Sequence, residues 1–307
     1  NYTKQLAESY WAIDKVIIEP QHSATTLEKI RFLRYLKAEK FDISISLFSS
    51  FSTGLQLLVA GIPYRYAPAT KIAQLLYNRK LKQRRSLSKK PEFEYNLDMV
   101  RFVLSDTHTA IPEYPVAPIL KFESQTTNIL RTNFYTRLNL NINQPLIFLH
   151  PGSGGSANNL SLQQFSELAG RLSSRYNAVI IITAGPNEAN YASDLAKLLH
   201  KTPNRIFESH NGLVDFSMHI TFANLFIGGS TGPLHIAGAL NIPTVGFYPK
   251  HRSATPLRWQ TLNSPDRRLA FVPPEGSENK NMSAIDIDNV AEEIVAKYSH
   301  FFTDKNS

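Results

Sequence analysis

The sequence predicts an α/β protein built on parallel sheets. Apolar runs such as 145–150 (PLIFLH) and 178–184 (AVIIITA) alternate with segments whose apolar residues recur at helical spacing. This alternation of strand and helix is typical of parallel sheets. The chain has 307 residues, enough for two domains of ordinary size, and the alternation restarts in the second half.

The first half begins the pattern. Leu27, Ile30, Leu33 and Leu36 share one helical face, and Gly61 is a natural stop for the helix before it. The predicted helices cover 25–40, 51–60, 70–81 and 94–104, and the predicted strands lie at the end of 12–19, within 41–48, from 62–66 and at 119–122. The prolines of 105–118 make that segment a connector.

The second half repeats the pattern more clearly. Its predicted strands are 145–150, 178–184, 205–207, 225–227 and 244–247, and its predicted helices are 161–174, 188–200, 213–221, 233–240 and 285–298. We expect an N-terminal domain over 1–125 and a linker over 126–143, whose first part is helical. A C-terminal domain over 144–307 closes with the last helix.

The charge balance favours anionic partners. The formal net charge is +8 and the isoelectric point is about 9.5. Much of the excess lies in one segment without acidic residues, which contains Arg79, Lys80, Lys82, Arg84, Arg85, Lys89 and Lys90. This 79–90 segment is either a solvated loop or a contact with an anionic acceptor or the inner membrane. The sequence contains no nucleic-acid-binding motif.

Several classes of protein are excluded by what the sequence lacks. It has no cysteine, so disulfides, thiolate metal sites and cysteine nucleophiles are absent. No apolar run approaches the length of a transmembrane helix, and the first residues do not resemble a secretory signal. We expect a cytoplasmic protein that is either free or peripheral on the cytoplasmic face of the inner membrane.

The most informative stretch is 224–240 (NLFIGGSTGPLHIAGAL). A buried strand ends at Ile227, two glycines break it, and Ser230, Thr231 and Gly232 form a polar turn. Pro233 suits the first position of a helix, which Leu234 and His235 continue. Such a turn is either a capped helix start or a site where backbone N–H groups and the helix dipole hold a phosphate.

Two other polar loops are expected at the same sheet edge. The loop 150–159 (HPGSGGSANN) has glycines that allow a phosphate to approach the backbone, including Gly152, and hydroxyls such as Ser153. It lacks the Lys-Ser/Thr ending of a Walker loop. The third loop, 184–188 (AGPNE), ends in Glu188. Three polar loops at the carboxyl edge of parallel strands predict one polyanion site.

Two side chains of this edge have alternative interpretations. His235 lies four residues after Thr231, so it either donates to a phosphate or sugar oxygen or serves as a structural hydrogen-bonding group. Glu188 begins a helix, where acids are favourable, or it accepts from sugar hydroxyls. The sequence has no hydrolytic elbow motif, and its nine histidines lack the pairing of a metal site.

Taken together, these motifs resemble glycosyltransferase family 9, which contains the ADP-heptose:lipopolysaccharide heptosyltransferases. The resemblance rests on HPGSGG, GPNE, TGPLHIA, NIPTVGFYP, RW, AGIPYRYAP and MSAIDIDNVAEEI. It covers nearly the whole chain, and TGPLHIA is its most specific part. It implies the GT-B fold, which has two Rossmann-like domains facing a cleft. It also implies a nucleotide sugar bound to the C-terminal domain, an acceptor bound to the N-terminal domain, and inverting transfer without a metal or other cofactor.

The resemblance also assigns donor-binding residues. Those that match the family's donor motifs are Gly152, Ser153, Glu188, Thr231, Gly232, Pro233, Leu234 and His235, with Asn211 as a weaker match in the base pocket. Ser230 replaces an Asp that the best-known members carry. Asn158 replaces a Lys that meets the diphosphate, a charge that the 250–252 segment would then have to supply.

The family's catalytic base is not found. It is an Asp in a Gly-Asp turn after the first strand, and this sequence, which starts at Asn1, has no matching segment. Asp42, Asp98 and Asp106 lie outside a strand-turn-helix context, so we expect an incomplete chain and name no base. Two alternatives to a heptosyltransferase therefore stay open, a non-catalytic nucleotide-sugar-binding relative and a GT-B nucleotide-sugar epimerase.

Overall fold

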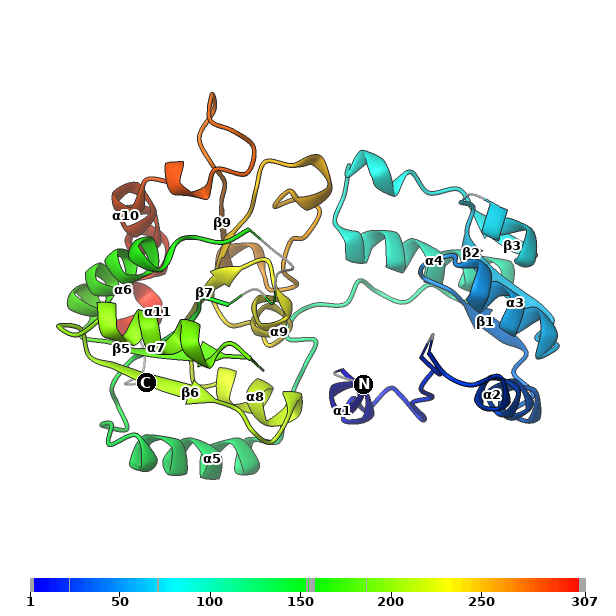
Figure 1. Ribbon diagram of the computed structural model, residues 1–307, viewed down its shortest axis with the longest axis horizontal. Coiled ribbons are helices and arrows are strands. Elements are labelled where there is room, and N and C mark those ends of the chain that lie inside the picture. Colours follow the sequence, from blue (N-terminus) through cyan, green and yellow to red (C-terminus); the bar gives the residue numbers. More distant parts are fainter. Residues whose placement is uncertain are drawn as a thin grey trace. The chain divides into compact units, whose positions relative to one another are not determined.

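The computed structural model describes residues 3–21, 23–70, 72–152, 154, 158–185 and 187–303. Its contacts divide the chain into two compact units (Figure 1). Unit 1 is formed by Lys15–Tyr114, and unit 2 by Pro115–Ser307 together with the N-terminal segment Tyr2–Asp14. The division falls before the expected boundary at 125, because the helix in the expected linker packs within unit 2 and buries Phe134 and Tyr135.

Unit 1 is a three-stranded parallel sheet with helices on its faces. Its strands are β1 (Ile43–Ile45), β2 (Tyr64–Pro68) and β3 (Arg79–Leu81), in the order β1-β2-β3. Its helices are α2 (Thr26–Ala38), α3 (Phe51–Val59), α4 (Glu92–Asp106) and the short 3-10 helices η1 (Ile72–Leu76) and η2 (Arg85–Leu87). A reciprocal capping box between Thr25 and Glu28 starts α2, and Gly61 ends α3 with a φ of +80°.

Three expectations for secondary structure are wrong. The expected helix 70–81 is instead η1 followed by β3, because Arg79–Leu81 pairs with Tyr66–Pro68 at the sheet edge. Residues 15–21 are irregular, and no described strand pairs with them. The expected strand 119–122 is also irregular, since the N–H groups of Ile119 and Leu120 both donate to the Ala239 carbonyl (2.8 and 3.0 Å).

Unit 2 is a six-stranded parallel sheet between two layers of helices. The strand order is β6-β5-β4-β7-β8-β9. The strands are β4 (Leu146–His150), β5 (Val179–Ala184), β6 (Asn204–Glu208), β7 (Leu225–Gly229), β8 (Thr244–Phe247) and β9 (Arg268–Phe271). The sequence did not predict β9, which has only four residues, none of them buried, and ends the sheet.

Among the α-helices of unit 2, six agree with the prediction within a few residues, and the first and the last were not predicted. The helices of this unit are α1 (Lys4–Glu8), α5 (Ser124–Arg137), α6 (Leu162–Tyr176), α7 (Ala189–Leu198), α8 (Leu213–Ile220), α9 (Gly232–Ala239), α10 (Ile287–Tyr298) and α11 (His300–Thr303), with the 3-10 helices η3 (Arg252–Ala254), η4 (Pro265–Arg267) and η5 (Met282–Ala284). Within the described part of the chain, every helix is too short or too polar to cross a bilayer.

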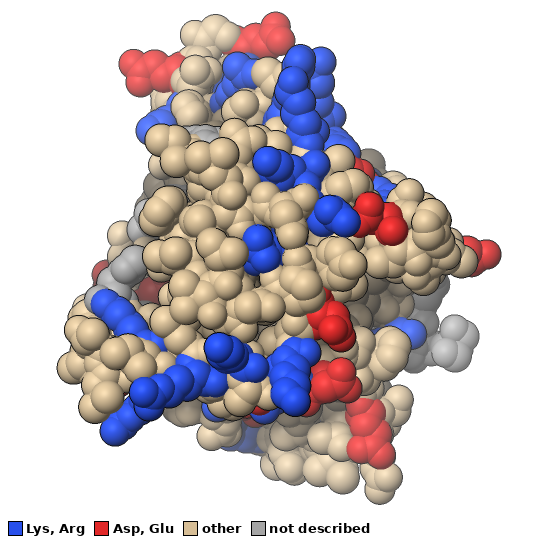
Figure 2. Space-filling view, turned by 90° about the vertical axis from the view of Figure 1, so that its right-hand side faces the viewer, with Lys and Arg blue, Asp and Glu red and all other residues tan. Residues whose placement is uncertain are grey.

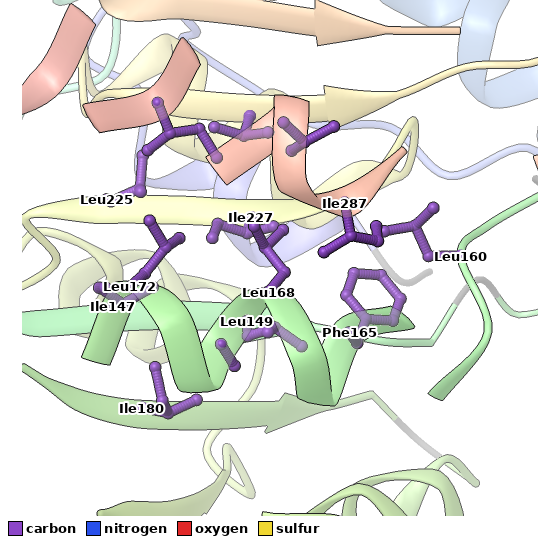
Figure 3. Close-up of a cluster of buried hydrophobic side chains, with 14 of the residues drawn as sticks. Ile147, Leu149, Leu160, Phe165, Leu168, Leu172, Ile180, Leu225, Ile227 and Ile287 are labelled. Carbon is purple, nitrogen blue, oxygen red and sulfur yellow. The ribbon is translucent and has the colours of Figure 1, made fainter. Parts of the chain in front are cut away.

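The two faces of this sheet carry separate cores. Alternate residues of β4, such as Ile147 and Leu149, face α6, α7 and α10, where Phe165 and Leu168 of α6 pack against them (Figure 3). Phe148 faces the other way, toward α5, α8 and α9. Because both faces are covered, the strands are apolar throughout, and the polar groups of the sheet gather at its ends.

Candidate functional site

The site of unit 2 lies at the point where the order of its strands reverses. From the central strand β4, the chain first proceeds outward through β5 and β6, and then returns to the other side of β4 for β7. Loops that leave the carboxyl ends of β4 and β7 therefore diverge at this point, which is where open α/β sheets bind ligands. The register pairs His150, the last residue of β4, with Gly228 of β7, so the two loops start side by side.

The loop after β7 forms the start of α9, as the sequence predicted. Thr231 is its N-cap with extended backbone angles, and Pro233 follows in the first turn. No side chain caps the helix, and the buried Oγ1 of Thr231 has no hydrogen-bond partner among the described atoms. A Cβ added to the exposed Gly232 would meet no atom within 4 Å. The helix start therefore offers N–H groups beside the open space at Gly232, and a buried hydroxyl that has no partner among the described atoms.

His235 lies one turn into α9, and its backbone N–H donates to the Thr231 carbonyl (3.2 Å). Burial lowers the pKa of its imidazole below the ordinary value of 6.5, so the ring is neutral at pH 7. Its ring centroid lies 6.4 Å from that of Trp259 in an edge-to-face arrangement. The Trp259 indole N–H donates to the Ser253 carbonyl (2.8 Å) within the segment after β8, and the ring contact with His235 places this segment beside the helix. Leu234 points into the core and anchors the first turn of α9 there.

Glu188 connects the two other loops of the edge. One carboxylate oxygen accepts from the N–H of Gly154 (2.8 Å), and the other accepts from the N–H of Gly185 (2.9 Å). The carboxylate thus ties the loop after β4 to the loop after β5, a structural role in addition to the predicted contact with sugar hydroxyls. Each oxygen retains a second lone pair for a ligand.

Gly152 and His150 make room for this carboxylate. A Cβ at Gly152 would lie 2.2 Å from the Glu188 carboxyl group, so a side chain cannot fit there without moving the loop. The buried His150 ring has its Nε2 3.5 Å from a Glu188 oxygen and its Nδ1 2.9 Å from Thr183 Oγ1. Burial lowers the pKa of His150, although the nearby Glu188 charge opposes this effect.

Asn159 packs the loop after β4 against the end of β7, a role that the sequence did not predict. Its side-chain amide donates to the Pro151 carbonyl (3.0 Å), and a Cβ at Gly229 would lie 3.0 Å from its side chain. Small residues in β7 therefore allow the β4 loop to approach. Asn158, its half-buried neighbour, is in the same loop, whereas Ser153 lies outside the described residues.

Of the remaining predicted donor residues, one lies at the start of α9 and the other lies two strands away from β4. Ser230 is half-buried in the turn before α9. Asn211 is exposed in the loop after β6, two strands from β4, or about 10 Å across the sheet. That loop turns at Gly212, whose φ is +88° and against which the side chain of Gln5 from α1 packs. Asn211 therefore lies at the same sheet edge but away from the switch point.

Two of the acids of unit 1 that the sequence singled out, Asp98 and Asp106, are engaged in ion pairs. Asp106 binds Arg79 (2.9 Å) and accepts from the Tyr66 hydroxyl, and these contacts lower its pKa. Asp98 binds Lys90 and Arg101. Neither is placed as a free general base. Among the described residues, no group of three or more His, Asp or Glu side chains is arranged to hold a metal ion.

Comparison with known proteins decides the family. The model of glycosyltransferase family 9 (heptosyltransferase) matches residues 29–273, which is most of the chain. The chain belongs to glycosyltransferase family 9. A putative glycosyltransferase of Haemophilus influenzae is 44% identical to this family 9 protein over 295 residues, which cover 96% of this chain and 85% of that protein.

Solved structures agree on the fold of this family 9 glycosyltransferase. A family 9 glycosyltransferase from Veillonella parvula superposes with a TM-score of 0.75 at 14% identity, covering 99% of this chain and 86% of that one. E. coli ADP-heptose lps heptosyltransferase II gives 0.68 at 18% identity, with coverages of 91% and 82%. The fold is α/β with parallel sheets, of the GT-B class.

Proposed function

We propose that this protein is an inverting, metal-independent glycosyltransferase that moves a heptose from ADP-heptose to the lipopolysaccharide core or a related anionic surface glycan. Membership of family 9 supports sugar transfer. The names of two solved relatives, ADP-heptose lps heptosyltransferase II and a heptosyltransferase with ADP, support the choice of donor. We further propose that the protein works in the cytoplasm, where the 79–90 segment contacts the inner membrane.

The observation that carries the proposal is the start of α9 at the switch point. Its uncapped N–H groups and the unpartnered Thr231 hydroxyl are the donors that a diphosphate needs. When the bond between sugar and diphosphate breaks, negative charge develops on the departing phosphate. Donors fixed in advance stabilise this charge in the transition state without reorganising.

The other loops complete this proposed donor site. The neutral His235 ring can donate to a phosphate oxygen, and Glu188, held by two backbone N–H groups, can accept from hydroxyls of the ribose or sugar. We propose Asn158 and Gly152 as further contacts of the β4 loop, and the 250–252 segment as the source of positive charge. Asn211 would contact only the nucleobase of the donor.

Nucleotide binding by the purified chain tests the donor site. Calorimetry with ADP, UDP and GDP should show binding, tightest for ADP. Thr231→Val removes the hydroxyl but keeps the shape, so ADP affinity should fall at least about tenfold. Because that hydroxyl is buried and makes no bond within the described structure, the free energy of unfolding should not fall. EDTA should not alter the affinity.

The control is Thr132→Val on α5, whose exposed hydroxyl bonds only within its own helix. It should leave ADP affinity unchanged. Absence of binding by any nucleotide would contradict the donor site, and equal affinity of Thr231→Val and the wild type would remove Thr231 from it.

A further inference from the structure

A buried histidine connects the central strands of unit 2 to the carboxylate of Glu188. His150 ends β4 and is only 3% exposed. The register pairs Leu149 with Ile182, so the residues that follow them, His150 and Thr183, are neighbours on β4 and β5. Nδ1 of the ring lies 2.9 Å from Thr183 Oγ1, and Nε2 lies 3.5 Å from Oε2 of Glu188. The ring is therefore held by the sheet on one side and faces the predicted donor site on the other.

The surroundings of the His150 ring determine which nitrogen carries its proton. Burial lowers the pKa of the ring, although the Glu188 charge opposes this effect, so the ring is neutral at neutral pH and holds a single N–H group. A carboxylate oxygen only accepts hydrogen bonds, so an unprotonated Nε2 would place two lone pairs against each other in a buried site. The proton therefore lies on Nε2, and Nδ1 accepts from the Thr183 hydroxyl.

The two oxygens of Glu188 are then occupied unequally. Oε2 accepts from the N–H of Gly185 (2.9 Å) and also faces the Nε2–H group of His150. Oε1 accepts from the N–H of Gly154 (2.8 Å), its one donor among the described residues. A carboxylate that is held in this way cannot rotate without losing these contacts. Oε1 therefore presents its remaining lone pair in a fixed direction, which favours a ligand hydroxyl that meets it there.

The order of the loops along the sheet edge favours the ribose as the source of that hydroxyl. Asn211 follows β6, Glu188 follows β5, and the start of α9 follows β7. Because the strand order is β6-β5-β4-β7, Glu188 lies between Asn211 and the start of α9. In a nucleoside diphosphate, the ribose likewise lies between the base and the diphosphate. A diphosphate at α9 and a base toward Asn211 would bring the ribose to Glu188.

We propose that His150 is a positioning residue, which donates from Nε2 and so holds Glu188 with Oε1 directed at a ribose hydroxyl of the bound nucleotide. The contact with the nucleotide rests on the proposed function. The position of the proton rests only on the geometry around the buried ring.

Binding of ADP and of dideoxy-ADP, which lacks both ribose hydroxyls, measures this contact. The wild type should bind ADP at least about tenfold more tightly than dideoxy-ADP. His150→Leu keeps a side chain of similar size but has no N–H group, so this ratio should fall to about two or less. His150→Gln, whose amide nitrogen can replace Nε2, should recover most of the ratio. If His150 only supported the fold, His150→Leu would weaken both nucleotides alike and leave the ratio unchanged, which would overturn the proposal.

The matched control is His219→Leu, the same substitution at another buried histidine of unit 2. His219 lies near the end of α8, where its Nδ1 donates to the Asp215 carbonyl (2.8 Å). This variant also loses a buried ring and its hydrogen bond, so its stability should fall. Its ratio of ADP to dideoxy-ADP affinity should stay within about twofold of the wild type. A collapse of the ratio in this control equal to that in His150→Leu would overturn the role of His150.

Nitrogen NMR of the nucleotide-free protein tests the position of the proton without any ligand. The His150 ring signals, identified by their loss in His150→Gln, should show the proton on Nε2. A proton on Nδ1 would overturn the inference even if ADP binds. Binding of ADP without preference over dideoxy-ADP would remove the ribose contact but leave the proposed function standing. Absence of ADP binding would refute the proposed function and, with it, the role of His150.

Discussion

Units 1 and 2 alternate strands and helices in the same way, but they cover their sheets differently. Every residue of β4, β5 and β7 is buried, whereas no residue of β1 or β3 is. Large apolar side chains such as Phe48 and Leu75 of unit 1 are more than three-quarters exposed. A sheet covered on both faces holds its loops against a rigid core, and a partly covered sheet does so less.

The two units also present different groups to an anion. The switch point of unit 2 offers backbone N–H groups, a buried hydroxyl and a neutral histidine, all fixed by packing. The 79–90 segment of unit 1 offers exposed cations such as Lys82, Arg84 and Lys89. Figure 2, seen from the side of β3 in Figure 1, shows Lys and Arg side chains gathering on this side of the molecule. Fixed dipoles select a ligand by geometry, whereas exposed charges attract many anions and are screened by salt.

The largest expected effect tests the difference in burial. Phe148→Ala removes a fully buried ring from β4 and should lower the free energy of unfolding by about 3–5 kcal/mol. Ile45→Ala in β1, where the side chain is 42% exposed, should cost less than about 1 kcal/mol. Urea denaturation followed by circular dichroism detects the unfolding of both units, whereas tryptophan fluorescence reports on unit 2 alone, because Trp11 and Trp259 both belong to it. Similar losses for the two variants would contradict the comparison.

A smaller effect tests whether geometry defines the donor loops. Gly152→Ala should lower the free energy of unfolding by about 1–3 kcal/mol, since its Cβ would overlap the Glu188 carboxylate. Gly232→Ala, where a Cβ meets nothing within 4 Å, should stay within about 0.5 kcal/mol of the wild type. Thermal unfolding measures both. If Gly152→Ala were as stable as Gly232→Ala, Glu188 would not hold the loops after β4 and β5 together.

The smallest expected effect is a dependence of the stability of unit 2 on pH. Burial lowers the pKa of His150, His219 and His235, all in unit 2, below the ordinary 6.5. The native state then binds fewer protons than the unfolded state, so stability is present above pH 6.5 and is lost as the pH falls below it. The midpoint of tryptophan-detected urea unfolding should therefore be lower at pH 5.5 than at pH 7.5.

The control for this prediction is His219→Asn. The amide of Asn can replace the bond between His219 Nδ1 and the Asp215 carbonyl (2.8 Å) but does not titrate. The difference between the two pH values should shrink in this variant. An unchanged difference would show that His219 does not contribute to it.

The sequence predicted the fold of unit 2 well because buried parallel strands have an unmistakable pattern. Runs such as LIFLH and VIIITA are typical of strands that are covered on both faces, and both of these strands are fully buried. The helix expected over 70–81 failed because β3 is short, partly exposed and defined only by pairing with β2, which lies earlier in the sequence.

The site was predicted in outline but not in its connections. The sequence pointed to the turn at Thr231 and to Glu188, since helix starts and Gly/Ser loops have local signatures. It could not show that Glu188 binds two loops or that Asn159 packs on Gly229, because these contacts join distant residues. For the same reason, the sequence could not show that part of the charge of the 79–90 segment is neutralised by acids of α4. The ion pairs are Arg85 with Glu92, Lys90 with Asp98 and Arg79 with Asp106.

The segment 2–14 packs in unit 2 even though all of unit 1 follows it in the chain. On the ribosome, α1 is therefore made long before α8, against which it packs. Leu6 and Tyr10, which join the core of unit 2, remain without their partners until translation has passed residue 220. Unit 2 is completed only by a late contact between distant parts of the chain, so newly made chains should depend on protection from aggregation during synthesis.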